Sequence, residues 1–168
     1  TAKAPATNVS NLNIALSNGT CAGLDAVSTS TNTRAGVAAV KQQENIYVTG
    51  TIGTAGNATV VVTAEGMANS PVTLSVPVAS GDSAATVATK VNAALEENSD
   101  ITDFFTISPA NGRYVRLTAK VAADNDPTLN ISIANDTCTG LTAIPTSTLD
   151  ASGNPGTKQV ETLTVAGR

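Results

Sequence analysis

Two cysteines are the residues of this chain whose type and placement could do chemistry. Cys21 and Cys138 each lie in the short motif T-C-x-G-L. Matching thiols can form a disulfide within one chain or between subunits, or they can be small buried side chains, which is the common fate of free cysteine. If the two motifs are related by simple translation, the two sulfurs of one chain lie too far apart to bond. A bridge between subunits is then the favoured form. The sequence therefore makes Cys21 and Cys138 a candidate disulfide, which would need an oxidising setting.

Catalytic and metal-binding patterns are weak in the rest of the chain. The sequence has no histidine, so the usual general base near neutral pH is missing, together with Ser-His-Asp and Cys-His arrangements. Two cysteines 117 residues apart, with no histidine in the chain, do not make a zinc site. Asp124-Asn125-Asp126 has oxygen ligands that suit Ca²⁺, but it lacks the glycine and distal glutamate of an EF-hand loop, and a polar turn needs no ion. We therefore expect a protein that is not an enzyme, with no catalytic residue, no metal and no cofactor.

Composition narrows the range of partners. The net charge is −4, charged residues make up 13% of the chain and aromatic residues 2%. No basic stripe and no platform for base stacking is visible, which argues against nucleic-acid binding. No apolar run approaches the length of a transmembrane span. The core must be built from small aliphatic side chains, each of which buries little area.

The chain contains an internal repeat that begins in the middle of the repeating unit. Residues 11–33 align with residues 128–150 at an offset of 117 residues, without a gap, and 12 of the 23 positions are identical. Average composition gives roughly two chance matches in such a window. The same offset continues downstream to Gly50 and Gly167.

This repeat predicts three parts of the chain. Residues 1–10 are small and polar, which is typical of a flexible N-terminal arm. Residues 11–50 form a partial repeat, the C-terminal part of a module. Residues 51–168 form a complete β-rich module.

Residue patterns predict an α+β fold that is mainly β, with antiparallel sheets and one helix. Thr- and Val-rich segments separated by Gly and Asn are typical of strands. The helix is predicted at about residues 82–98, where Asp82 or Ser83 can cap it. Its apolar stripe consists of Val87, Val91, Ala94 and Leu95. Strands are predicted at residues 11–16, 44–49, 58–64, 72–78, 104–108, 113–119 and 129–133.

The partial repeat predicts a surface for assembly. A repeat fragment usually cannot bury its apolar face alone and needs a neighbouring unit. That neighbour is either another subunit or the complete module of the same chain. The apolar positions of the predicted assembly segment are Leu12, Ile14, Leu16, Ile46 and Val48.

One stretch of the chain resembles a known kind of module. Its residues are a TVVVTA strand, a returning strand, GDSAATVATKVNAALEEN, then FFTIS-PANG-RYVRLTAK and NDPTLNISIA, within residues 58–143. This order resembles the small β-hairpin–helix–β-hairpin modules that recur in structural proteins of tailed bacteriophages. Such modules appear in tail proteins and in capsid-decorating or fibre proteins, and a similar pattern occurs in insertions of bacterial flagellins. The resemblance implies a repeated adhesive or scaffolding module and transfers no catalytic residue.

These observations favour a structural protein of a multi-subunit assembly. The first expectation is a bacteriophage virion component, either capsid decoration or tail, with copies of itself and other virion proteins as partners and with no nucleic acid and no membrane. A second is a secreted bacterial filament or surface-layer subunit, outside the cell, assembled by strand donation. A third is a carbohydrate-binding adhesion module, although only Tyr47 and Tyr114 are available for sugar stacking.

Overall fold

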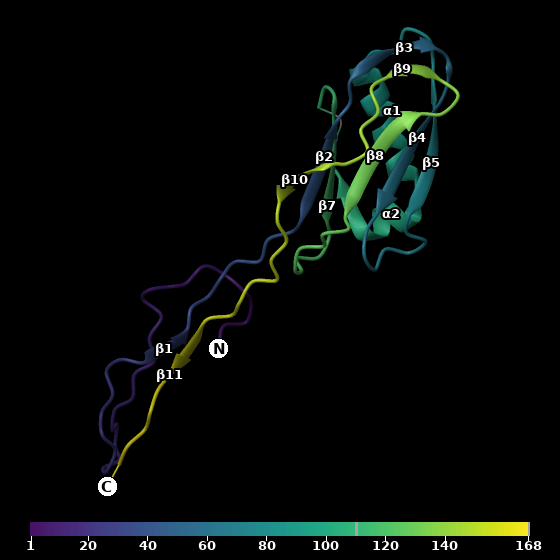
Figure 1. Ribbon diagram of the computed structural model, residues 1–168. Helices are drawn as coiled ribbons and strands as arrows, with labels where there is room; N and C mark the ends of the chain where they lie inside the picture. Colours follow the sequence, from purple (N-terminus) through teal and green to yellow (C-terminus); the bar gives the residue numbers. More distant parts are fainter. Residues whose placement is uncertain (110, 168) are drawn as a thin grey trace. The chain divides into compact units, whose positions relative to one another are not determined.

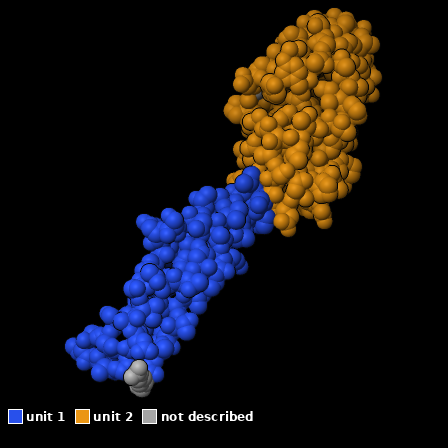
Figure 2. Space-filling view, turned by 60° about the vertical axis from the view of Figure 1, so that its left-hand side comes forward, with its two compact units in different colours: residues 1–40, 154–168 blue, residues 41–153 orange. Residues whose placement is uncertain are grey.

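The computed structural model describes residues 1–109 and 111–167 and divides into two compact units (Figure 1). Unit 1 consists of Thr1–Val40 and Asn154–Arg168, and unit 2 consists of Lys41–Gly153. Figure 2 draws each unit in its own colour. The chain is 39% strand and 12% helix, with antiparallel sheets, so the predicted α+β, mainly β fold class is confirmed.

Unit 2 is built on two antiparallel sheets and one short strand pair. The four-stranded sheet has the order β10-β2-β7-β6, with β10 (Thr148–Ala151), β2 (Gln43–Tyr47), β7 (Tyr114–Ala119) and β6 (Phe105–Ile107). The three-stranded sheet has the order β5-β4-β8, with β5 (Val72–Val78), β4 (Gly56–Thr63) and β8 (Asn130–Asn135). The short pair joins β3 (Gly50–Thr54) to β9 (Thr139–Leu141).

The two hairpins of unit 2 follow from local sequence. In β4, Ala58, Val60 and Val62 are buried and alternate with half-buried residues, so one face of the strand points to the core. Its partner β5 lies at the edge of its sheet, where Pro77 removes only an outward-facing donor. The predicted strands at 104–108 and 113–119 form β6 and β7, which pair with each other, and Ala110 between them lies outside the described residues.

Two helices lie in unit 2, where one was predicted. Helix α1 (Ala84–Glu97) begins at Ser83, whose side chain accepts a hydrogen bond from the Thr86 amide at 3.2 Å. Its apolar stripe packs against β5 and β7. The second helix, α2 (Ser99–Phe104), forms because the Asn98 side chain accepts a hydrogen bond from the Ile101 amide and starts a new turn.

The hydrophobic core lies in unit 2. Eighteen of the 25 buried hydrophobic residues of the described chain fall within residues 52–117, which we call the middle segment. It contains β4, β5, both helices, β6 and the start of β7, and it ends within the four-stranded sheet. The other seven are Ile46, Val48, Leu129, Ile131, Ile133, Cys138 and Leu141. The core therefore forms where the middle segment packs against the rest of the module.

Unit 1 has much less regular structure. Its only named strands in the described residues are β1 (Thr31–Arg34) and β11 (Val160–Thr162), which pair with each other. The strand predicted at residues 11–16 does not form, and Leu16 makes only an isolated bridge to Val27. That prediction was wrong because an alternating pattern forms a strand only when another strand pairs with it.

The predicted division at residue 51 also differs from the structure. The complete module begins at Lys41 and ends at Gly153, because β2 lies between β7 and β10. Residues 154–167 belong with residues 1–40 instead. The first ten residues are not a free arm, since the Ala2 amide donates to the Gln159 carbonyl at 2.8 Å and the Val9 backbone bonds to the Gln159 side chain.

Candidate assembly surface

Several hydrogen bonds of unit 1 repeat in unit 2 at equivalent positions. Asn18 bridges the backbone of Leu24 through its amide group, with bonds of 2.7 and 3.1 Å. At the offset of 117 residues, Asn135 bridges Leu141 in the same way at 2.8 and 3.1 Å. Further bonds repeat at the same offset: Asn13–Ser30 with Asn130–Ser147, Ser30–Glu161 with Ser147–Glu44, and Val9–Gln159 with Asp126–Gln42.

Strand pairing repeats in the same register. In unit 1, β1 pairs with β11 through Thr31–Thr162, Asn32–Glu161 and Arg34–Val160. In unit 2, β10 pairs with β2 through the residues 117 positions away, Thr148–Asn45, Leu149–Glu44 and Ala151–Gln43. The register shifts at equivalent residues in both pairs, between Asn32 and Arg34 in β1 and between Leu149 and Ala151 in β10. Identical residues at matching positions therefore specify one local arrangement twice.

The repeat also extends upstream of residue 11, where it was predicted to begin. The Ala2–Gln159 backbone bond corresponds to a bond from the Ala119 amide to the Gln42 carbonyl at 2.9 Å. Five of the first eight residues are identical to their counterparts in residues 118–125, including the shared Thr-Ala-Lys. Extending the alignment upstream would have assigned this segment to the repeat instead of to a flexible arm.

We call the shared arrangement the frame. In unit 2 it consists of residues 41–51 and 118–153, and in unit 1 of residues 158–167 with residues 1–36. Within the described residues, unit 1 has no counterpart of the middle segment that fills the frame in unit 2.

Burial shows the consequence of this difference. Leu12, Ile14 and Val165 are 42%, 44% and 57% exposed. Their counterparts in unit 2, Leu129, Ile131 and Val48, are 7%, 0% and 0% exposed. Of the seven hydrophobic frame residues buried in unit 2, none has a buried counterpart in unit 1, whereas the polar pair Gln42 and Gln159 is buried in both. We call Leu12, Ile14 and Val165 the open face, because it is the core side of a frame that unit 1 does not fill.

The same region of unit 1 has an open strand edge. In β8, the amides of Ile131 and Ile133 point to Ser147 and Ile144, so the alternate amides face β4. In unit 1, Ile14 and Leu16 make the matching bonds to Ser30 and Val27. The alternate amides of Asn13, Ala15 and Ser17 have no hydrogen-bond partner among the described residues. We call these three residues the open edge.

The predicted assembly segment is therefore split between two environments. Leu12 and Ile14 are exposed in unit 1, and Leu16 is half-buried. Ile46 and Val48 lie in the core of unit 2, at 2% and 0% exposure, so their prediction as assembly residues is corrected. Their counterparts in unit 1 at the offset of 117 residues are Leu163, which is half-buried, and Val165, which is 57% exposed.

The two cysteines also differ in environment. Both thiols donate to the matching asparagine side chain, Cys21 to Asn18 at 3.7 Å and Cys138 to Asn135 at 3.3 Å. Both are free, but Cys21 is exposed and Cys138 is only 3% exposed. A folded unit 2 keeps Cys138 from reaching another subunit. Of the predicted disulfide pair, only Cys21 is therefore available for a bond between chains.

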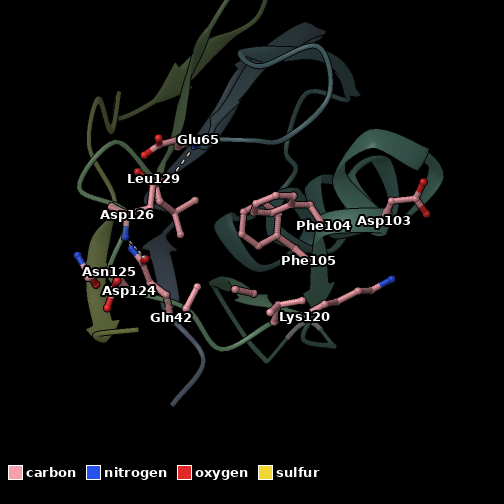
Figure 3. Close-up of a pocket in the computed structure, with 13 residues that line it drawn as sticks. Gln42, Glu65, Asp103, Phe104, Phe105, Lys120, Asp124, Asn125, Asp126 and Leu129 are labelled. Carbon is pink, nitrogen blue, oxygen red and sulfur yellow. Dashed lines mark hydrogen bonds between the residues drawn. The ribbon is translucent and has the colours of Figure 1, made fainter. Parts of the chain in front are cut away.

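A pocket of about 330 Å³ opens in unit 2 (Figure 3). Phe104, Phe105 and Leu129 form its apolar wall, and the Lys120 side chain extends away from it. On its polar side, Gln42 bonds to the Asp126 backbone through both its amide oxygen and its amide nitrogen.

Two carboxylates of unit 2 have shifted ionisation. Burial disfavours the charged form of Asp126, but hydrogen bonds from the Thr128 hydroxyl and from backbone amides outweigh burial and hold the pKa below its usual value. The Lys90 ammonium at 2.5 Å and the Ala79 amide lower the pKa of Asp82. In the predicted polar turn, Asn125 accepts a bond from the Gly153 amide. These oxygens therefore stabilise loops of the module.

The two tyrosines suggested for sugar stacking are neighbours on the β2–β7 pair. Their ring centroids lie 4.7 Å apart at 69°, an edge-to-face arrangement. The Arg113 guanidinium lies over the Tyr47 ring, 4.3 Å from its centroid, and bonds to its hydroxyl. The rings therefore form no shared flat platform, and one face of Tyr47 is covered.

Comparison of the chain with protein-family models, with curated proteins and with solved structures found no match. Neither of the helices that the structure describes is long and apolar enough to cross a membrane.

Proposed function

We propose that this protein is a non-enzymatic structural subunit of a multi-subunit assembly. The single observation that carries the proposal is the open face of unit 1. Leu12, Ile14 and Val165 are exposed on a frame whose other copy buries the same positions in a core. Exposed apolar positions that a module is built to bury mark an interaction surface. Low charge and small side chains favour packing between subunits over recognition of a charged ligand.

The assembly that we propose is a bacteriophage virion, with the protein in capsid decoration or in the tail. The resemblance of residues 58–143 to tailed-phage structural modules supports this choice, and all of these residues lie in unit 2. The partners are then copies of this chain and other virion proteins.

A secreted bacterial filament or surface layer is a second candidate. The observation that favours it is the open edge at Asn13, Ala15 and Ser17, since unpaired backbone groups of an edge accept a strand from a neighbouring subunit. Both candidates share the same type of subunit and differ in the structure that it builds.

Light scattering and electron microscopy of the purified chain test the proposal. We expect oligomers or ordered assemblies, alone or with virion proteins, with an interface of at least about 1,000 Å². Ile14→Asp places a charge on the open face and should abolish assembly. Val121→Asp is the matched control, because Val121 is 73% exposed in unit 2 and lies outside the open face. A chain that stays monomeric with every candidate partner overturns the proposal.

A further inference from the structure

We propose that unit 1 is completed by a strand from a neighbouring polypeptide, and that this strand has the chemistry of β4. The inference rests on the proposed assembly role and names the partner that the open face takes. The observation that supports it is unit 2, where β4 fills the same frame.

In unit 2, strand β4 both pairs with the edge of the frame and contributes to the core on its apolar side. Residues 58–63 of β4 pair antiparallel with β8 along the whole length of β8. Its buried residues Ala58, Val60 and Val62 contribute to the core that covers Leu129 and Ile131. One strand therefore satisfies the edge amides and contributes to the core that covers the apolar face.

The offset of 117 residues predicts the register of the donated strand. Val60 pairs with Ile133 and Val62 with Ile131, so the matching donor residues should lie opposite Leu16 and Ile14. The donor residue that matches Ala58 should lie opposite Asn18. We therefore expect small or β-branched apolar residues at alternate positions of the donor, without charge, as in GNATVVVT of β4.

Exchange of the middle segment between copies of residues 1–168 cannot complete every frame. These residues contain two frames, in unit 1 and unit 2, but one middle segment. If a second copy donated its β4 to unit 1, its own unit 2 would lose the core. The donor is therefore an additional β4-like strand, separate from the one that fills unit 2.

The exposure of the Cys21 thiol should report whether a strand has paired with the open edge of unit 1. In unit 2, the Cys138 amide donates to the Asn57 carbonyl at 3.2 Å, and Gly56 lies against the backbone of Thr137 and Cys138. The start of β4 therefore lies against the backbone of Cys138, whose side chain is buried. A donated strand in the same register should cover Cys21 in the same way.

The experiment adds a strand donor to the full-length chain. The probe is a synthetic peptide of residues 54–78, which contains β4 and β5, and a peptide of the same composition in scrambled order is its control. A second probe is the whole middle segment, residues 52–117, as a separate polypeptide. Binding is measured by fluorescence anisotropy of the labelled probe, and protection is measured by the rate of Cys21 alkylation.

We expect at least one native-sequence probe to bind saturably and to slow Cys21 alkylation at least tenfold, while Cys138 stays protected. Ile14→Asp should weaken binding at least tenfold. Ala15→Pro should do the same, because it blocks the open edge without removing any hydrogen bond of the free chain. Val121→Asp should leave binding unchanged.

Three results overturn the inference: neither native probe binds, the scrambled peptide binds equally well, or the Ile14 and Ala15 variants bind normally. If the chain alone forms a dimer that hides Cys21 and is broken by Ile14→Asp, the occupant is a second copy and not a donated strand. Assembly without probe binding would refute only the donated strand. Probe binding by a chain that never assembles would refute the proposed function instead.

Discussion

Unit 1 and unit 2 contain the same frame, with many equivalent hydrogen bonds and the same strand register, but among the described residues only unit 2 has a hydrophobic core. The Asn18–Leu24 and Asn135–Leu141 bridges differ by no more than 0.1 Å. In contrast, Ile14 is 44% exposed and Ile131 is fully buried. The polar turns of this module are therefore specified locally, whereas burial depends on the middle segment.

The comparison also shows what makes a strand in this protein. Residues 130–135 form β8, paired with β4 along their length, whereas residues 13–18 form no strand although the sequences are similar. Alternating apolar residues favour extended structure but do not supply the hydrogen-bond partner. Secondary structure at this position is thus a consequence of the neighbouring strand.

The largest effect should come from matched truncations in the two frames. Ile131→Ala removes a fully buried side chain and should lower the free energy of unfolding by about 2–5 kcal/mol. Ile14→Ala, at the equivalent position of unit 1, should change it by no more than about 0.5 kcal/mol. Urea unfolding followed by circular dichroism measures both. Equal losses would mean that unit 1 has a core after all.

The next largest effect should be a difference between the two units in the rate of thiol alkylation. Cys21 is exposed, while reagent reaches Cys138 only when unit 2 opens, and opening of a core segment costs several kcal/mol. We expect Cys21 to react at least about a hundredfold faster with iodoacetamide. Mass spectrometry of the two labelled peptides gives the two rates, and similar rates would contradict the contrast in burial.

Non-reducing electrophoresis of the assembled protein then tests whether Cys21 forms a bond between subunits. A dimer that collapses on addition of thiol and is lost in Cys21→Ser supports a Cys21–Cys21 bond. Cys138→Ser is the control and should keep the dimer, because Cys138 stays inside folded unit 2.

Substitution of the bridging asparagines should have the same effect in both units. Asn18→Ala and Asn135→Ala each remove two hydrogen bonds to a leucine backbone. We expect each to destabilise its own unit by about 1–3 kcal/mol, because the leucine groups lose their partners. Calorimetry of the two variants tests this equality. If only Asn135→Ala has an effect, the frame of unit 1 is not a stable structure.

The smallest effect should be a difference in acid sensitivity. Asp126 has a lowered pKa, so its contribution to stability is complete above the unfolded-state value near 3.8 and is lost as pH falls through the folded-state pKa. Its counterpart in unit 1 is Val9, which does not titrate. Unit 2 should therefore weaken below about pH 4. Asp126→Asn should flatten that part of the stability curve, and an unchanged curve would contradict the assignment.

Much of unit 2 could be predicted from local sequence, because its signals act within a few residues. Ser83 caps α1, the stripe from Val87 to Leu95 gives the helix its buried face, and alternation in β4 gives a strand. Helix α2 was missed because its start depends on one side chain, that of Asn98, at the end of the preceding helix.

The assembly surface was only partly predictable. The repeat identified Leu12, Ile14 and Leu16, which lie in the unfilled frame. It misassigned Ile46 and Val48, because the sequence does not show that residues 41–50 pair with the later part of the chain. Short strand pairs such as β1–β11 and β3–β9 join residues more than 80 positions apart, and no local pattern indicates them.

Hydrogen exchange at single residues tests the central claim most directly, since it compares the two edges in one sample of the full-length chain. The amides of Ser132 and Ala134 face β4 in unit 2, while those of Ala15 and Ser17 face no partner in unit 1. We predict that Ala15 and Ser17 exchange near the rate of an unstructured peptide, while Ser132 and Ala134 exchange only when unit 2 opens. Strong protection of Ala15 and Ser17 in the isolated chain would show that unit 1 is already complete, and would contradict this account.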